Sequence, residues 1–170
     1  MEQNSSIKNV NKKTKSNTKW KITKYFILWG IFVFAGIQVK KIILNQLASN
    51  IIINPIFAFK EVHNTGAAFN LFQGRTDALV LAGIICIAAL TGFVLFKPQK
   101  ITQQMTSAAA LLTAGMTINT AERIRQGFVT DFIYLNFFDK FPVFNIADIM
   151  IVIGALMLAC ALLFKSKNGR

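Results

Sequence analysis

The chain has 170 residues, of which 54% are hydrophobic and 15% are charged, and its formal net charge is +12. An ordinary soluble domain has about 45–50% apolar and about 25% charged residues, so this composition is typical of a membrane protein. Because a helix that crosses a bilayer uses about 20 residues, four spans would use roughly 80 and leave no room for a separate soluble catalytic domain. Any chemistry must therefore lie on the spans or in the loops that join them.

The N-terminal segment differs sharply in composition from the rest of the chain. Residues 1–24 are polar and rich in lysine without apolar periodicity, which predicts a disordered basic tail. An apolar run then begins at Tyr25 and continues to about Leu44, provided that Lys40 and Lys41 snorkel toward the headgroups. No small-residue cleavage site comes after this run, so we expect an uncleaved membrane anchor.

Three further apolar segments each predict a transmembrane helix, at residues 78–96, 103–121 and 146–164. The second of them is rich in Ala, Leu and Thr, and small residues let helices approach closely in lipid, so we expect it to be buried among the others. The sequence therefore predicts an all-α membrane protein with four transmembrane helices. Its expected domains are the tail, a four-span membrane domain and a short basic cytoplasmic end (1–24, 25–165 and 166–170, with the first span at about 25–44).

The basic residues are distributed unevenly about the predicted spans. Seven lie in the tail, two in the loop between the second and third spans, and three at the C-terminal end. By the positive-inside rule, this excess places both termini in the cytoplasm. Six of the seven acidic residues lie on the outer side, so we expect chemistry at the outer membrane face. The positive charge indicates topology and attraction to anionic lipid, and nucleic acid binding is not expected.

Two outer segments connect the spans. The first, residues 45–76, contains short β-branched and aromatic stretches around Asn54 and Pro55, which predict a small sheet or hairpin. The second, residues 119–145, is apolar but punctuated by Asp131, and we expect it to lie at the membrane interface. A small β-rich element is therefore expected outside the four helices.

Two aspartates are the candidate catalytic residues. Asp148 lies about one turn into the last span, where an ionisable residue is costly. Helix capping explains it equally well, because Asn145 would be the N-cap with an acid three residues later. Asp131 stands in an apolar stretch, and its simpler explanation is an ordinary interfacial acid. If both reach the same membrane boundary, however, they can share one proton, as aspartic protease chemistry requires.

Other catalytic groups are less favoured by the sequence. His63 is the only histidine, and no cluster has metal-ligand spacing, so we expect neither a metal nor another cofactor. Cys86 and Cys160 both fall inside predicted spans, where we expect them to be small apolar packing residues. A cation or proton pathway is disfavoured because only Asp148 lies within a span.

Three short motifs occur along the chain: NTGAAF at residues 64–69, GFVTDF at residues 127–132 and FPVFNIAD at residues 141–148. The first two resemble the N-x-G-A-A-F and G-x-V-x-D-F segments of the lipoprotein signal peptidase family (signal peptidase II). Residues 141–148, FPVFNIAD, resemble its F-P-x-F-N-x-A-D segment. The motifs occur in the family's order, and the resemblance extends over about residues 25–165.

The resemblance implies an intramembrane aspartyl endopeptidase that removes signal peptides from diacylglyceryl-modified bacterial prolipoproteins, cutting before the lipidated cysteine. It implies a multi-pass protein of the bacterial cytoplasmic membrane whose partners are that substrate and membrane lipids. Nothing in the sequence requires more than a monomer. Asp131 and Asp148 match the family's catalytic pair. The residues that match its substrate-binding or site-supporting positions are Asn64, Gly66, Asn119, Glu122, Arg123 and Asn145.

Simpler roles remain open for several of these residues. Gly66 could only provide a turn, and Asn145 could only cap a helix. Arg123 could contact a phosphate or a carbonyl at the interface, or could pair with Glu122 or Asp131.

Two segments depart from the family pattern. Residues 37–41, IQVKK, stand where the family has D-Q-x-x-K, so Gln38 and Lys41 match but the acid is replaced by Ile37. Residues 114–123, AGMTINTAER, stand where it has G-G-x-x-G-N-x-x-D-R, so one of three glycines remains and glutamate replaces aspartate.

The glutamate departure bears on activity. Its additional methylene could displace its hydrogen bonds by about 1 Å, which costs roughly 100-fold in rate. The alternative to an active peptidase is a catalytically silent relative that binds lipid-modified peptides, which the loss of the acid at position 37 and of the glycines that allow close helix approach suggests.

Overall fold

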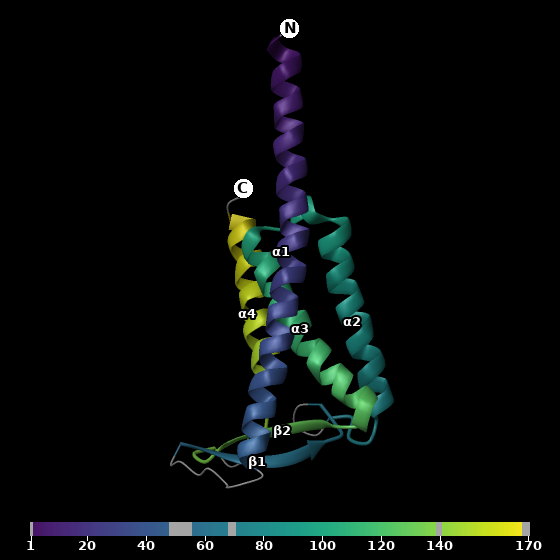
Figure 1. The fold of residues 1–170 in the computed structure, drawn as a ribbon, viewed down its shortest axis with the longest axis vertical. Helices are drawn as coiled ribbons and strands as arrows, with labels where there is room; N and C mark the ends of the chain where they lie inside the picture. Colours follow the sequence, from purple (N-terminus) through teal and green to yellow (C-terminus); the bar gives the residue numbers. More distant parts are fainter. Residues whose placement is uncertain (1, 48–55, 68–70, 139–140, 168–170) are drawn as a thin grey trace.

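The computed structural model describes residues 2–47, 56–67, 71–138 and 141–167. Four helices run alongside one another, and two strands lie across one end of them (Figure 1). Helix α1 begins and helix α4 ends at the opposite end of the molecule (Figure 1). The elements in chain order are α1 (Glu2–Leu47), β1 (Phe57–Asn64), α2 (Thr76–Phe96), the 3₁₀ helix η2 (Pro98–Lys100), α3 (Gln103–Gln126), β2 (Val129–Leu135) and α4 (Ile146–Lys167).

Helix α1 is longer than the sequence analysis predicts. The prediction of a disordered tail over residues 1–24 is wrong for residues 2–24, because α1 begins at Glu2. No proline or glycine precedes Gly30, so a helix nucleated in the apolar segment can continue through the polar one. The N-terminal part of α1 consequently projects beyond the other helices (Figure 1).

Within the part of the chain that the structure describes, three helices are long and apolar enough to cross a membrane. They comprise Ser16–Leu47 within α1, all of α2, and Ile146–Phe164 within α4, and only 6–11% of the residues in their apolar windows are buried. Helix α3, also among the described residues, is long enough to cross a membrane but is not apolar enough to be counted with them. It packs against α1, α2 and α4, and its small residues are buried there. Because α3 contacts protein more than its surroundings, it can carry small and polar residues that lower its hydropathy.

Helices α3 and α4 approach most closely where small residues face the partner backbone. A Cβ added at Gly115 would meet the carbonyl oxygen of Ala147 and would lie 2.9 Å from Cγ1 of Ile151. A Cβ added at Gly154 would lie 2.6 Å from the backbone nitrogen of Leu112. Gly115 is the one glycine that remains of the three in the pattern described above. Because it has no side chain, the first turn of α4 can pack directly against α3.

Replacing this glycine is expected to destabilise the protein. Gly115→Ala should lower the free energy of unfolding by about 1–3 kcal/mol, because the added methyl group must displace α4. Gly30→Ala is a matched control, since a Cβ at that helical position meets nothing within 4 Å. Thermal unfolding of both variants in one detergent checks this, and equal stabilities would contradict the close approach of α3 and α4.

Strands β1 and β2 form an antiparallel sheet in which Val62 is opposite Asp131 and Asn64 is opposite Val129. The predicted β-rich element is thus present, but its second strand comes from the second outer segment and not from residues 45–76. Residues 48–55, which that prediction also included, lie outside the described residues. The sequence of β2, VTDFIYL, is rich in β-branched and aromatic residues that favour strands. Because β2 lies across one end of the helices, Asp131 within it lies at that end (Figure 1).

Candidate active site

Asp131 lies in the middle of β2 and is only 2% exposed. Its Oδ2 accepts a hydrogen bond from Nδ2 of Asn64 at 2.8 Å, and its Oδ1 accepts one from Nδ2 of Asn145 at 2.6 Å. Asn64 is the last residue of β1, so the strand pairing places it beside Asp131. Asp131 is therefore a buried strand residue, and its interpretation as an ordinary interfacial loop acid is wrong.

Asp148 lies in the first turn of α4, which Asn145 caps. Oδ1 of Asn145 accepts from the backbone N–H of Ala147 at 2.6 Å, and Oδ2 of Asp148 accepts from the backbone N–H of Asn145 at 2.9 Å. These reciprocal bonds form a capping box, so the capping interpretation of Asn145 is confirmed. The other carboxylate oxygen of Asp148 accepts from Nδ2 of Asn119 at 2.8 Å. One oxygen of Asp148 therefore takes part in the helix cap. The other accepts a hydrogen bond from Asn119 of α3, which orients the carboxyl group.

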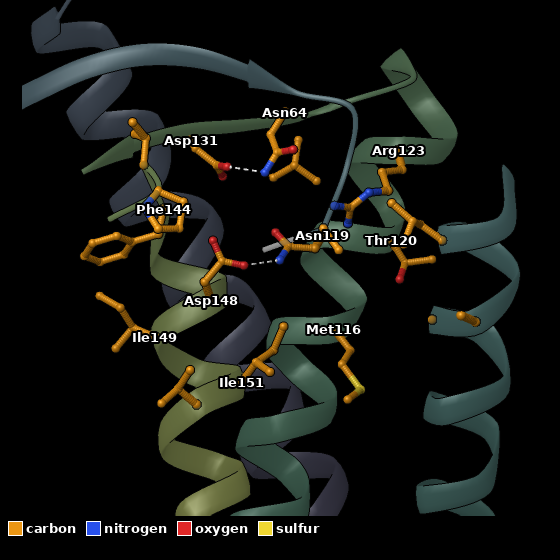
Figure 2. Close-up of a pocket in the computed structure, with 18 of the residues that line it drawn as sticks. Asn64, Met116, Asn119, Thr120, Arg123, Asp131, Phe144, Asp148, Ile149 and Ile151 are labelled. Atoms are coloured by element: carbon orange, nitrogen blue, oxygen red, sulfur yellow. Dashed lines mark hydrogen bonds between the residues drawn. The ribbon is translucent and has the colours of Figure 1, made fainter. Parts of the chain in front are cut away.

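Asn145 also connects the two aspartates. It is fully buried, and its Nδ2 donates both to Asp131 and to Oδ1 of Asn119 at 3.2 Å. A continuous hydrogen-bonded network thus runs from Asn64 through both aspartates to α3. Figure 2 shows the Asp131 side chain extending from β2 and the Asp148 side chain extending from α4 into the same space.

Burial alters the acidity of Asp131. Removal from solvent raises the pKa of Asp131 to about 6, although the N–H donors of Asn145 and Asn64 oppose the shift because they stabilise the ionised form. The charge of Asp148 raises this pKa further, and that of Lys40 lowers it. Asp131 can therefore exchange a proton near neutral pH.

The two aspartates border a cavity of about 710 Å³. Its polar lining consists mainly of four members of the network described above and Arg123, and the rest of its wall is mainly apolar; the four are Asn64, Asn119, Asp131 and Asp148. This combination suits a ligand with a long apolar part and a polar centre that needs to be oriented. The apolar residues on its wall include Leu79, Ala82, Met116, Ile149, Val152 and Ile153, from α2, α3 and α4.

Arg123 lines this cavity and contacts Gly66, a buried residue next to the lining residue Ala67. The backbone N–H of Gly66 donates to Oδ1 of Asn64 at 2.9 Å, which fits its predicted role in a turn. Nη2 of Arg123 donates to the carbonyl oxygen of Gly66 at 2.6 Å. The carbonyl contact considered for Arg123 is thus present, and Nε of Arg123 is buried without a hydrogen-bond partner. Ala68 and Phe69, the last residues of the NTGAAF segment, lie outside the described residues.

Glu122 has a partner that the sequence analysis did not identify. Nζ of Lys40 lies 2.5 Å from Oε2 of Glu122, and Lys40 is only 5% exposed. The expectation that Lys40 snorkels to the headgroups is therefore wrong. Oε2 of Glu122 also accepts the backbone N–H of Thr130 at 3.1 Å. The sequence signal was a lysine within an apolar run, but only the packing of α1 against α3 reveals its partner.

The two cysteines do not have the predicted packing role. Cys86 and Cys160 are free thiols on exposed helix surfaces, and Cys86 lies on the cavity wall. A helix in lipid does not need to bury such a residue among other helices, which explains the difference.

Comparison with known proteins identifies relatives over most of the chain. The family described as Signal peptidase (SPase) II matches residues 22–164. A lipoprotein signal peptidase of Dehalococcoides mccartyi is 40% identical over 116 residues, which are 66% of this chain and 71% of that protein. One from Staphylococcus aureus (strain JH9) is 35% identical over 156 residues, which are 86% of this chain and 95% of that protein.

Solved structures agree with these relatives. A bacterial membrane enzyme determined by the in meso method at 2.3 Å resolution has a TM-score of 0.74 and 29% sequence identity, covering 87% of this chain and 92% of its own. A second such enzyme, at 1.9 Å resolution, has a TM-score of 0.69 and 30% identity, covering 83% of this chain and 93% of its own. From its sequence match, its fold and its apolar helices, the chain belongs to the lipoprotein signal peptidase family, bacterial membrane proteases that cleave the signal peptides of prolipoproteins.

Proposed function

We propose that this protein is an aspartyl endopeptidase that cuts diacylglyceryl-modified prolipoproteins just before the lipidated cysteine, with Asp131 and Asp148 as the catalytic residues. The observation that carries the proposal is the position of Asn145, whose side chain donates to Asp131 while its backbone donates to Asp148. One residue thereby fixes both carboxyl groups at the polar end of one cavity. A site for a nucleophilic water between two carboxyl groups is the requirement of this chemistry.

The reaction needs one ionised and one protonated aspartate. The ionised carboxylate takes a proton from a water molecule, whose oxygen attacks the scissile carbonyl carbon. The protonated partner donates a hydrogen bond to the oxyanion that develops, and a proton is then delivered to the leaving amine. Asn64 and Asn119 each donate to one of the aspartates, so they hold the carboxyl groups in position for both steps.

The substrate occupies the cavity with its scissile bond at the polar end. Arg123 and Asn64 lie there and contribute polar groups that can bind the peptide backbone, and the contacts of Gly66 hold both of them in place. The apolar wall formed by α2, α3 and α4 accommodates the hydrophobic signal peptide and the acyl chains of the lipid. In this proposal the partners are the lipid-modified prolipoprotein and the surrounding lipids, and the protein acts as a monomer without a cofactor.

All four helices cross the bacterial cytoplasmic membrane in this proposal, with α3 shielded from lipid by the other three. Both termini are cytoplasmic, since the excess of lysine and arginine lies at that end. The sheet and both aspartates then lie at the outer face, where a translocated prolipoprotein presents its cleavage site.

A gel-shift cleavage assay tests the proposal. The purified protein in detergent is incubated with a diacylglyceryl-modified prolipoprotein and, separately, with the unlipidated form. We expect cleavage of the lipidated form alone and its loss in Asp148→Asn. Binding of the lipidated substrate without cleavage would contradict the proposal and would indicate a catalytically silent relative.

The activity should depend on pH through Asp131. Its pKa of about 6 means that protonation below this pH leaves both carboxyl groups neutral and removes the general base. We expect kcat/KM to fall by about tenfold per pH unit well below pH 6. An ordinary aspartate, with a pKa near 3.9, would place this fall at a lower pH. A profile of kcat/KM between pH 4 and 8 checks this, and a flat profile down to pH 4.5 would contradict the assignment.

A further inference from the structure

We propose that Lys40 is a positioning residue for Asp131, acting through Glu122 and the backbone of β2. The inference rests on the proposed catalytic role of Asp131. Lys40 lies next to Lys41, the lysine that matches the family's motif. In this proposal Lys40 fixes the position of strand β2, and Glu122, which replaces the family's aspartate, is its partner.

The first observation is the link between α1, α3 and β2. Lys40 and Glu122 form an ion pair that is largely removed from solvent, with side-chain exposures of 6% and 19%. The same Glu122 oxygen that faces Lys40 accepts the backbone N–H of Thr130. Thr130 directly precedes Asp131, so the carboxylate of Glu122 fixes the strand one residue away from the catalytic side chain.

The second observation lies on the other side of Asp131. Nζ of Lys40 is 6.0 Å from the centre of the Phe132 ring, which is fully buried. An ammonium group at this distance from an aromatic face is attracted by it. Lys40 therefore acts on both chain neighbours of Asp131, on Thr130 through Glu122 and on Phe132 directly.

The choice of lysine is specific to this chain. Lys41 matches the lysine of the D-Q-x-x-K motif, but it is exposed, whereas Lys40 points into the protein. Ile37 occupies the position of that motif's acid, and it is also exposed, at 48%. Oε2 of Glu122 contacts both Lys40 and Thr130, and we expect an aspartate, which is shorter by one methylene, to lose at least one of these contacts. Glu122→Asp should consequently lower activity and not restore it.

The charge of Lys40 gives a signature that a purely structural role lacks. Charged groups reach Asp131 from three elements: Lys40 on α1, Arg123 on α3 and Asp148 on α4. Of these, Lys40 lowers the pKa of Asp131 and Asp148 raises it. Loss of the lysine charge should therefore move the acid limb of the pH profile to higher pH.

The test compares Lys40→Met with Lys41→Met, which makes the same change one residue later. We expect Lys40→Met to lower kcat by about 10- to 100-fold, as a displacement of a catalytic group by about 1 Å would. KM should change by less than about threefold, and the acid limb should shift upward. Lys40→Arg should recover most of the rate, and Lys41→Met should match the wild type. Wild-type kcat and pH profile in Lys40→Met, or the same loss in Lys41→Met, would overturn the proposal.

Two further measurements keep the result interpretable. In the double variant Lys40→Met/Glu122→Gln, the loss should not exceed that of Lys40→Met, because the two residues act as one unit. Hydrogen–deuterium exchange of peptides covering 129–135 should rise in Lys40→Met and remain unchanged in Lys41→Met. This readout does not require turnover, so a wild-type protein that fails to cleave would refute the proposed function and leave exchange to decide the role of Lys40. Unchanged exchange in Lys40→Met would refute that role.

Discussion

Asp131→Asn and Asp148→Asn are each expected to reduce cleavage of a lipid-modified prolipoprotein by at least about 10²- to 10⁴-fold, the contribution of a general acid or base. Neither amide can take a proton from the attacking water or exchange one with its partner. Both variants retain the size of the side chain, so the bundle should remain folded. The reaction would stop because its proton transfers stop.

The hydrogen bonds of Asp131 add to this effect. Both of its oxygens accept from amide donors, Nδ2 of Asn64 and Nδ2 of Asn145. An asparagine at position 131 has only one acceptor oxygen and turns its own NH₂ group toward one of these donors. The network must then rearrange, and Asp148→Asn has the same consequence because the two oxygens of Asp148 accept from Asn119 and from the backbone N–H of Asn145.

Initial rates in the gel-shift assay measure the loss. Retention of each variant on a column that carries the lipidated substrate shows whether the variant still recognises it. We expect binding within about threefold of the wild type for Asp148→Asn. Turnover by either variant at more than about a tenth of the wild-type rate would remove that residue from the catalytic pair.

Asn145→Ser is expected to separate helix capping from catalysis. A serine side chain also accepts from the first N–H groups of a helix, so α4 stays capped. It lacks the NH₂ group that reaches Asp131 and Asn119, and a hydrogen bond to a charged group contributes about 1.5–3 kcal/mol. We expect kcat/KM to fall by about 10- to 100-fold, and the acid limb to move to higher pH because this donor lowers the pKa of Asp131.

Asn145→Ala is the comparison variant, because it removes the cap as well. Its rate should resemble that of Asn145→Ser, while its free energy of unfolding should be lower by about a further 1 kcal/mol. Rates from cleavage assays and melting temperatures in the same detergent distinguish the two effects. Wild-type activity in Asn145→Ser would mean that Asn145 serves only as a helix cap.

Local sequence patterns predicted much of this site because the groups involved are close along the chain. Asn145 and Asp148 are three residues apart, and the capping box that joins them depends on that spacing alone. The apolar runs of α2 and α4 likewise predicted helices of the right type and approximate position. The projecting part of α1 was missed because its polar composition resembles that of a disordered segment, while its extension depends on the adjoining helix.

The contacts between distant segments could not be derived in this way. Asn64 and Asp131 meet because β1 and β2 pair, although 67 positions separate them in the sequence. Lys40 and Glu122 meet, over 82 positions, because one turn of α1 faces the end of α3. A one-residue change in helix rotation would bring Lys41 forward in place of Lys40, and no local pattern determines that rotation.

The sequence by itself determined the membrane composition, the apolar helices, the capped start of α4, and the resemblance that points to Asp131 and Asp148. Each of these depends on residue type and on spacings of a few positions, which helical and strand periodicity convert directly into structure. Only the tertiary structure decided that Asp131 is a buried strand residue joined to α4 through Asn145, and that Lys40 and not Lys41 reaches Glu122. These features depend on helix rotation and strand register, which the packing of the whole chain determines.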